Sequence, residues 1–148
     1  MSATRAPATA GYSGKAAWQK LGLAPGLRIL VRHAPGDYAT LVGVPPGVLH
    51  EVGPRSAFDL VHVFADRRAT LASELGALAP RLPADGTLWI SWPKKASGIV
   101  TDVVEDTVRE LALPLGLVDV KVCAVDATWS GLKLVWRREH RAGKPTRA

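Results

Sequence analysis

Strand-like and helix-like segments alternate along this chain, and this alternation constrains its fold more than any other feature. Apolar runs at 27–31, 58–64 and 87–92 predict three strands, and a shorter strand is expected within 48–52. Segments with helical spacing of apolar residues separate these strands. Such alternation is typical of a mostly parallel sheet with helices on both faces. We therefore expect an α/β fold with three layers.

Two of the helical segments carry capping signals. Leu71, Leu75 and Leu78 recur at helical spacing, Asp66 is a good N-cap before them, and Pro80 predicts that this helix ends just ahead of it.

A later helix is expected to begin with Thr101 as its N-cap. Asp102, Glu105 and Asp106 then fall in its first turns and Arg109 follows, a charge order that suits the helix dipole.

Two segments of alternating pattern close the chain, at 118–124 and 132–137, with a loop at 126–131 between them. This arrangement predicts a β-hairpin that adds an antiparallel strand to the sheet.

The composition fits one domain. The chain has 148 residues, of which 47% are hydrophobic and 22% are charged, enough apolar mass for a single core. We expect one α/β domain at 12–139, a disordered tail at 1–11 and a basic disordered tail at 140–148. The sequence contains neither an apolar run of the roughly 18 residues that a membrane span needs nor an N-terminal signal region. These observations predict a cytoplasmic protein without membrane contact.

The single cysteine, Cys123, excludes an intramolecular disulfide and a zinc cluster built on cysteines. It lies among valines of a predicted strand, which favours a packed thiol over a nucleophile. The histidines show no metal-ligand spacing, and no serine lies in a nucleophile elbow. We expect no metal and no resident cofactor.

The formal net charge is +6, and much of it lies near the C-terminus. The basic residues there are Arg137, Arg138, Arg141, Lys144 and Arg147. Such a segment binds nucleic-acid phosphates without sequence specificity. A solubilising tail is the simpler interpretation, so a nucleic-acid accessory role is kept as an alternative.

Two segments resemble motifs of the class I methyltransferases, whose Rossmann-like sheet ends in an antiparallel hairpin. The segment 58–63 resembles the strand after which that family often places catalytic groups, and 82–90 resembles a later strand entry. The resemblance covers 22–138 and implies a Rossmann/methyltransferase-like fold. The close-approach glycines of that family are missing, because 32–37 contains one glycine, and Glu51 is the one candidate for holding a ribose. A degenerate S-adenosylmethionine-dependent enzyme is therefore an alternative function.

Five short motifs carry a closer resemblance. They are YSG at 12–14, WPKK at 92–95, TD at 101–102, DVKVCAVD at 119–126 and WSGLK at 129–133. Together they resemble an uncharacterised bacterial family of short proteins, a domain of unknown function. This resemblance spans nearly the whole chain and implies a family without implying an activity.

The loop after the strand at 87–92 is the best candidate ligand site. Open α/β sheets bind ligands at the carboxyl ends of their strands, and this loop offers ammonium groups, hydroxyls and a predicted helix N-terminus. Its candidate residues are Lys94, Lys95, Ser97, Gly98 and Thr101. They suit a phosphate or a carboxylate. The alternative is a solvated lysine pair beside an ordinary N-cap.

Three further places are candidates. Trp129 and Ser130 lie in the hairpin loop, where the tryptophan either contacts a ligand or folds over the sheet edge as a lid. Tyr12 and Ser13 either cap the same pocket or pin the N-terminus. His33 ends the first strand and is the one histidine we would test as an acid or base.

These patterns predict an uncharacterised, non-catalytic binding or regulatory domain. Its ligand would be an anionic small molecule or peptide at the C-terminal edge of the sheet. The sequence does not indicate an oligomeric state.

Overall fold

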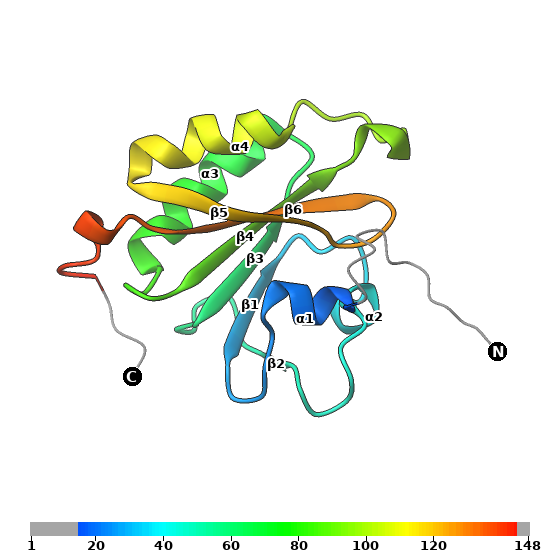
Figure 1. Cartoon of the computed structure of the whole chain (residues 1–148), viewed down its shortest axis with the longest axis horizontal. Coiled ribbons are helices and arrows are strands. Elements are labelled where there is room, and N and C mark those ends of the chain that lie inside the picture. Colours follow the sequence, from blue (N-terminus) through cyan, green and yellow to red (C-terminus); the bar gives the residue numbers. More distant parts are fainter. Residues whose placement is uncertain (1–14, 145–148) are drawn as a thin grey trace.

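The computed structural model describes residues 15–144, which form one six-stranded sheet with helices on both faces (Figure 1). The strand order is β2-β1-β3-β4-β6-β5. The first four of these strands are parallel, β6 is antiparallel to β4, and β5 is antiparallel to β6. The strands are β1 (Arg28–Arg32), β2 (His50–Glu51), β3 (Leu60–Phe64), β4 (Thr87–Pro93), β5 (Leu117–Ala124) and β6 (Trp129–Trp136). The predicted α/β class and the closing antiparallel hairpin are confirmed.

Four α-helices of the described part of the chain cover the sheet: α1 (Ala17–Leu21), α2 (Tyr38–Val42), α3 (Arg68–Leu78) and α4 (Glu105–Ala112). The described residues also form short 3₁₀ turns: η1 (Ala79–Arg81), η2 (Lys95–Ser97), η3 (Leu113–Leu115) and η4 (Arg138–His140). Figure 1 shows α3 and α4 on one face of the sheet and α1 and α2 on the other. The order β1-α2-β2 runs one way across the sheet and β3-α3-β4 runs the other, which is a doubly wound arrangement.

Two apolar clusters fill the spaces between the layers. The cluster under α3 and α4 contains Leu71, Leu75 and Leu78 from the predicted apolar face of α3. The cluster under α1 and α2 contains Trp89, whose indole N–H donates to the carbonyl of Leu21 at 2.9 Å. A buried indole needs such a partner, so this bond fixes α1 against the central strand β4.

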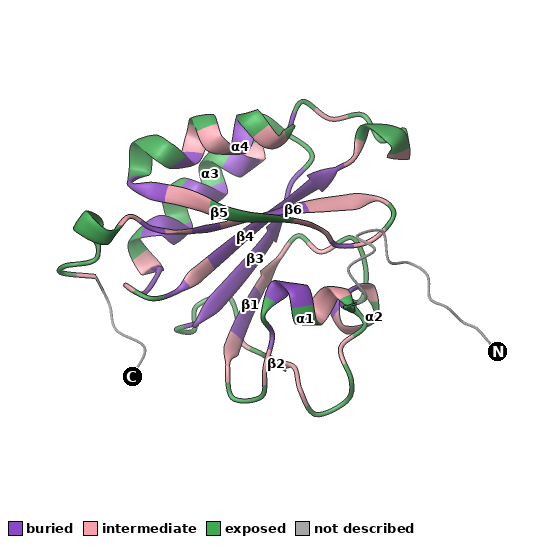
Figure 2. Ribbon diagram, in the orientation of Figure 1, coloured by how far each residue is buried: buried purple, intermediate pink, exposed green. Residues whose placement is uncertain are grey.

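Burial falls from the middle of the sheet to its edge (Figure 2). Every residue of β3 is buried, whereas Val120 and Val122 in the edge strand β5 are half exposed. A register shift between Asp119 and Lys121 interrupts the pairing of β5 with β6. Bulges and lysines of this kind protect an open sheet edge from pairing with another chain.

Several local expectations are corrected. The N-cap of α3 is Arg67, not Asp66, and the later helix begins at Glu105 with Val104 as its N-cap, not at Thr101. The hairpin loop is shorter than expected, because β6 begins at Trp129 and pairs with β5 from Ser130 onward. Within residues 15–144, no helix has the length and apolar character needed to cross a membrane.

Candidate ligand-binding site

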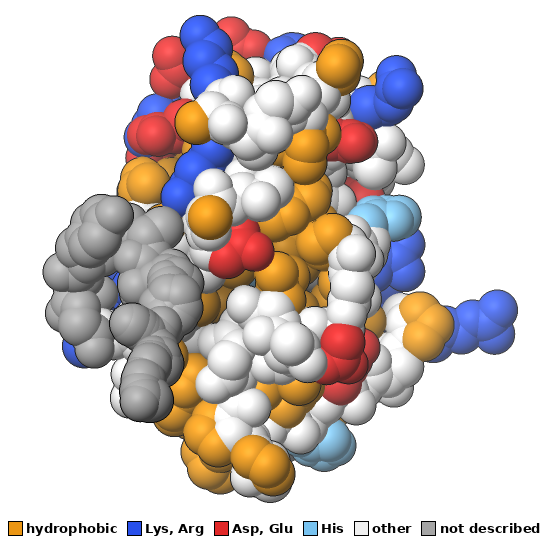
Figure 3. Space-filling view, turned by 90° about the vertical axis from the view of Figure 1, so that its right-hand side faces the viewer, with side chains coloured by type: hydrophobic (Ala, Val, Ile, Leu, Met, Phe, Trp, Pro, Cys, Tyr) orange, Lys and Arg blue, Asp and Glu red, His pale blue; other side chains and the backbone are white. Residues whose placement is uncertain are grey.

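The C-terminal edge of the parallel strands is the part of the molecule where a doubly wound sheet binds ligands. The strand order reverses between β1 and β3, so the loops after these two strands diverge toward opposite faces. Strand β5 runs in the direction of β4, which brings the loop between β5 and β6 to this same edge. Figure 3 looks onto this side of the molecule and shows hydrophobic side chains gathered along its middle, with acidic side chains beside them.

A cleft of about 370 Å³ lies on this edge, between the β1–α2 loop and the β5–β6 hairpin. Its lining residues are Pro35, Gly36, Asp37, Thr40, Leu41, Asp126 and Trp129. The cleft therefore joins segments that are far apart in the sequence, and its polar groups are mainly carboxylates.

Each of the two carboxylates in the cleft is held by one of its oxygens. Oδ2 of Asp37 accepts the backbone N–H of Thr40 at 3.0 Å and its hydroxyl at 2.7 Å. Oδ1 of Asp126 accepts the backbone N–H groups of Thr128 and Trp129, both at 2.8 Å. The bonds from Thr40 hold the pKa of Asp37 below its usual value. Among residues 15–144, no side chain forms an ion pair with either carboxylate.

Trp129 forms the apolar wall of the cleft. Its ring meets Phe64 edge to face, with the ring centroids 5.3 Å apart, and it packs on the cluster under α1 and α2. The side chain is partly buried, so it both covers the end of β3 and contributes surface to the cleft. The two interpretations of Trp129 are thus compatible.

A buried hydrogen-bonded chain lies behind the cleft. The Tyr38 hydroxyl is 2.7 Å from Nδ1 of His62, and Nε2 of His62 is 2.7 Å from the Ser91 hydroxyl. His62 is fully buried, and burial lowers its pKa to about 3. The imidazole is therefore neutral and donates through one nitrogen while accepting through the other. These hydrogen bonds fix α2 to strands β3 and β4, and they thereby position Asp37, which directly precedes α2.

His33 lies at the end of β1, as expected, and contacts a carboxylate. Its Nε2 is 2.6 Å from Oε2 of Glu74 on α3, and both carboxylate oxygens of Glu74 also accept from the Arg32 guanidinium. Burial alone would raise the pKa of Glu74, but the bonds from Arg32 and His33 hold it below its usual value.

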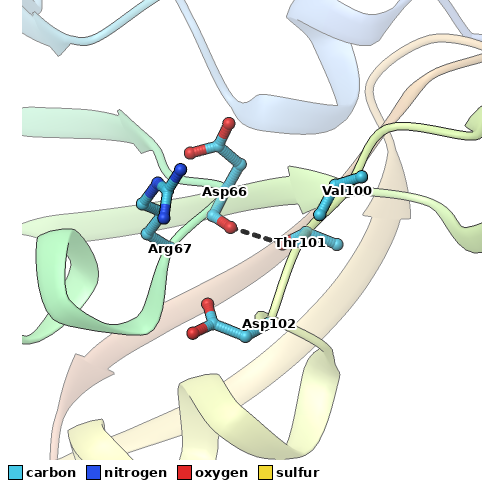
Figure 4. A pocket seen from close by; sticks show the side chains of 5 residues that line it. All are labelled: Asp66, Arg67, Val100, Thr101 and Asp102. Carbon is cyan, nitrogen blue, oxygen red and sulfur yellow. Dashed lines mark hydrogen bonds between the residues drawn. The ribbon is translucent and has the colours of Figure 1, made fainter.

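A second pocket, of about 230 Å³, lies between the loop after β3 and the segment before α4 (Figure 4). Asp66, Arg67, Val100, Thr101 and Asp102 line it. The Thr101 hydroxyl donates to the backbone carbonyl of Asp66 at 2.7 Å, and the carboxylate of Asp102 accepts the backbone N–H of Arg68 at 2.6 Å. Asp102 therefore supplies the side-chain cap of α3 from a distant segment, whereas the side chain of Arg67, which occupies the N-cap position, forms no capping hydrogen bond.

The predicted lysine loop follows β4 and lies at the expected edge, with its polar groups largely engaged. The Lys94 ammonium donates to the carbonyl of Asp126 at 2.8 Å, and the Ser97 hydroxyl donates to the carbonyl of Lys94 at 2.6 Å. Lys95 and Gly98 are exposed. The N-terminus of α4 lies beyond Thr101, so the loop offers no helix N-terminus at the position where the sequence predicted one.

The other candidates are placed as follows. Ser130 is the second residue of β6 and pairs with Trp92 of β4, so it is part of the sheet and outside the loop. Tyr12 and Ser13 lie outside the described residues. Within residues 15–144, no group of three or more His, Cys, Asp or Glu side chains is arranged to hold a metal ion. Burial raises the pKa of the Cys123 thiol, which disfavours its thiolate.

The described part of the basic C-terminal segment, which ends at Lys144, lies at the opposite edge of the sheet (Figure 1), and Arg147 lies outside the described residues. The Lys144 ammonium stands over the Trp136 ring, 4.0 Å from its centroid, and the Arg141 guanidinium donates to the carbonyl of Trp136. Both side chains thus pack on the domain, and nucleic-acid binding by this segment stays a prediction.

Sequence reasoning missed Tyr38, Ser91, Glu74 and the carboxylates of the cleft as site residues. Glu74 had a usable signal, because it falls on the apolar face of α3 between Leu71 and Leu78, where a lone carboxylate needs a partner. Tyr38, His62 and Ser91 had no such signal, since each lies in an apolar setting that looks like ordinary core.

No family model matches the chain, and no curated protein matches it in sequence. Solved structures do match it. TrmN from Thermus thermophilus has a TM-score of 0.55 at 12% identity, with 82% of this chain and 47% of that one covered. A SAM-dependent methyltransferase from Aquifex aeolicus has a TM-score of 0.54 at 14% identity, with 78% of this chain and 85% of that one covered.

LepI, solved in complex with SAM, has a TM-score of 0.52 at 14% identity, with 81% of this chain and 39% of LepI covered. The chain thus spans less than half the length of LepI and TrmN. These likenesses concern the fold. The mixed six-stranded sheet, mostly parallel with antiparallel strands at its C-terminal end, is a class I methyltransferase-like Rossmann fold.

Proposed function

We propose that this domain binds a small molecule in the cleft between the β1–α2 loop and the β5–β6 hairpin. One observation carries the proposal: the cleft lies at the ligand-binding edge of a doubly wound sheet, with an aromatic wall and two positioned carboxylates. Pockets of this kind bind ligands through one apolar surface and a few oriented polar groups.

The lining residues indicate the chemistry of the ligand. Trp129 suits a planar or cationic group, because an indole stacks on rings and attracts cations. Asp37 and Asp126 each direct one oxygen to the backbone, which leaves the other oxygen to accept from a ligand. A ligand with a ring and with hydroxyl or amino donors is therefore favoured over a simple anion at this cleft.

S-adenosylmethionine is the first probe for this cleft. It carries a ring, ribose hydroxyls, an ammonium group and a sulfonium group, and LepI, which has a similar fold, was solved in complex with it. The loop at 32–37 departs from the usual cofactor grip, because Gly36 is its one glycine. The proposal therefore rests on the cleft and treats S-adenosylmethionine as one of several probes.

The experiment is calorimetry with S-adenosylmethionine, S-adenosylhomocysteine, adenosine and spermidine on the wild type and on D37N and D126N. Asparagine keeps the cap and the turn but removes the charge. A probe held by these carboxylates should lose about tenfold in affinity in one or both variants. The exposed Glu139 lies at the other edge of the sheet, so E139Q is the matched control. Equal affinity in all four proteins, or no binding of any probe at millimolar concentration, would overturn the proposal.

An anionic ligand is a second candidate, supported by the position of Lys94. Its ammonium lies on the carbonyl of Asp126, a residue of the cleft, so it can meet a phosphate or carboxylate of a ligand at the rim. Pyrophosphate should raise the melting temperature of the wild type more than that of a K94A/K95A double variant. Equal shifts in the two proteins would remove this candidate.

We also propose that the chain belongs to the uncharacterised bacterial family that its motifs resemble and acts in the cytoplasm. Support comes from the five motifs, two of which contribute Asp126 and Trp129 to the cleft. Homologues that keep both residues in an otherwise varied hairpin would strengthen this assignment.

A further inference from the structure

His33 has a backbone conformation that distinguishes it from every other described residue besides glycine. Its φ is +61°, in the left-handed region, where the backbone of a residue other than glycine is strained. It directly follows Arg32, the last residue of β1, at the place where the strand order reverses. His33 thus has an unfavourable backbone conformation at the C-terminal edge of the parallel strands.

Glu74 orients the His33 ring. Nε2 of His33 is 2.6 Å from Oε2 of Glu74, a carboxylate that is 10% exposed and receives two further bonds from Arg32, at 3.1 and 3.0 Å. A carboxylate fixed in this manner stays ionised and accepts a proton-bearing nitrogen. In the neutral imidazole the proton therefore lies on Nε2, and Nδ1 carries the lone pair.

Nδ1 of His33 is available to a ligand. The His33 side chain is 47% exposed, and within residues 15–144 no group hydrogen-bonds Nδ1. The ring is not needed to tie β1 to α3, because the bidentate contact between Arg32 and Glu74 already does so. His62 offers the contrast: both of its nitrogens are bonded and the ring is fully buried.

We propose that His33 is a catalytic base whose Nδ1 accepts a proton from water or from a substrate hydroxyl at the C-terminal edge of the sheet, with Glu74 as its positioning residue. A carboxylate, an imidazole and an accessible nitrogen are the arrangement that activates an oxygen nucleophile. This inference does not depend on occupancy of the cleft, so it can fail while the proposed binding function stands, and the reverse.

Hydrolysis of p-nitrophenyl acetate tests the base without a known substrate. Nδ1 takes a proton from water as the water oxygen bonds to the acetyl carbon. The bond from that carbon to the nitrophenyl oxygen then breaks, and its electron pair leaves with nitrophenolate. The products are acetic acid, nitrophenolate and one proton, which the imidazolium returns to solvent. No oxidant, metal or second reactant is needed.

The main variant is H33G, because glycine accepts a φ of +61° without strain and removes the base. The protein-dependent rate should fall by about a hundredfold, at the low end of what a positioned base contributes. Added imidazole should then accelerate H33G by a larger factor than the wild type, because it can bind beside Glu74. E74Q should lower the rate by a smaller factor, since it keeps an acceptor but loses the charge.

Two controls separate this base from ordinary surface imidazoles. His50 and His140 are both exposed, so H50Q and H140Q should keep the rate within about twofold of the wild type. H33N provides a second variant that tolerates the same backbone conformation, should H33G not fold. The proposal is overturned if H33G or H33N keeps more than half of the wild-type rate, or if imidazole accelerates H33G and the wild type by the same factor.

Discussion

His62 and His33 lie on neighbouring parallel strands or just beyond them, and each contacts an oxygen at a short distance, yet their environments are opposite. His62 is fully buried in β3, with a hydroxyl on each ring nitrogen. His33 stands at the end of β1, with one nitrogen on Glu74 and about half of its surface exposed. Burial lowers the pKa of His62 to about 3, and its two hydroxyl partners carry no charge that would stabilise an imidazolium. His62 therefore stays neutral near neutral pH.

The same side chain thus has different roles in the interior of the sheet and at its edge. In the interior, two neutral hydroxyls satisfy the imidazole and make it a structural link between α2, β3 and β4. At the edge, an ionised carboxylate and access to solvent leave one nitrogen for chemistry. The largest changes in stability are therefore expected at the buried histidine, and the largest changes in reactivity at the exposed one.

Removal of the buried imidazole should have the largest effect on stability. H62A leaves a cavity between β3 and β4 and removes a partner from both Tyr38 and Ser91. We expect the free energy of unfolding, from urea denaturation, to fall by about 3–4 kcal/mol, since a cavity and unsatisfied buried groups act together. Y38F removes one hydroxyl and should cost about 1–2 kcal/mol. If H62A costs no more than Y38F, the ring is not the centre of this network.

Stability should also fall in mild acid because of His62. Its folded pKa of about 3 lies below the unfolded value of 6.5, so the folded protein binds fewer protons between these values. The contribution of the neutral His62 to the free energy of unfolding is fully present above pH 6.5 and is lost as the pH falls toward 3. Between pH 6.5 and 5, above the range in which carboxyl groups titrate, the free energy of unfolding should drop by about 2 kcal/mol. H62Q should show a flatter profile there. The same slope in wild type and H62Q would assign the acid sensitivity to other groups.

The two histidines also show how much the sequence reveals. The periods of the apolar residues predicted β3, the apolar face of α3 and the position of His33 after β1, because these depend on local pattern. The Asp102 cap of α3 and the Tyr38–His62–Ser91 chain depend on residues far apart in the sequence. Local pattern assigned Thr101 as a cap for its own helix, although its hydroxyl bonds the loop after β3. The lysine loop was predicted from its place in the fold. The carboxylates of Asp37 and Asp126 were not assigned to a site, because local pattern marks Asp37 as a helix cap and Asp126 as the start of the hairpin loop.

A smaller effect should mark the packing around Ser91. Gly131 lies opposite Ser91 in the β4–β6 pairing, and a Cβ there would stand 3.3 Å from the Trp89 ring and 3.5 Å from the Ser91 hydroxyl. Both neighbours are fully buried, so G131A should lower the free energy of unfolding by about 1 kcal/mol. Gly76 in α3 is the matched control, because a Cβ at that position meets nothing within 4 Å. G76A should instead raise stability by up to about 1 kcal/mol. Stabilisation by both alanines would show that Trp89 and Ser91 have room to move.

The smallest change in stability is expected for H33G. A small change would distinguish His33 from His62, whose removal should cost the most stability. Glycine relieves the strain of the left-handed backbone, while the loss of the ring removes the contact with Glu74. The two effects oppose each other, and Arg32 still pairs with Glu74. The free energy of unfolding should therefore change by less than about 1 kcal/mol, measured by urea denaturation beside H62A. If H33G lost nearly as much free energy of unfolding as H62A, His33 would be a structural histidine like His62. Its backbone conformation would then be explained by stability and not by reactivity. A small change in stability, together with a large loss of the protein-dependent hydrolysis rate, would show that the chain holds this strained residue for its reactivity.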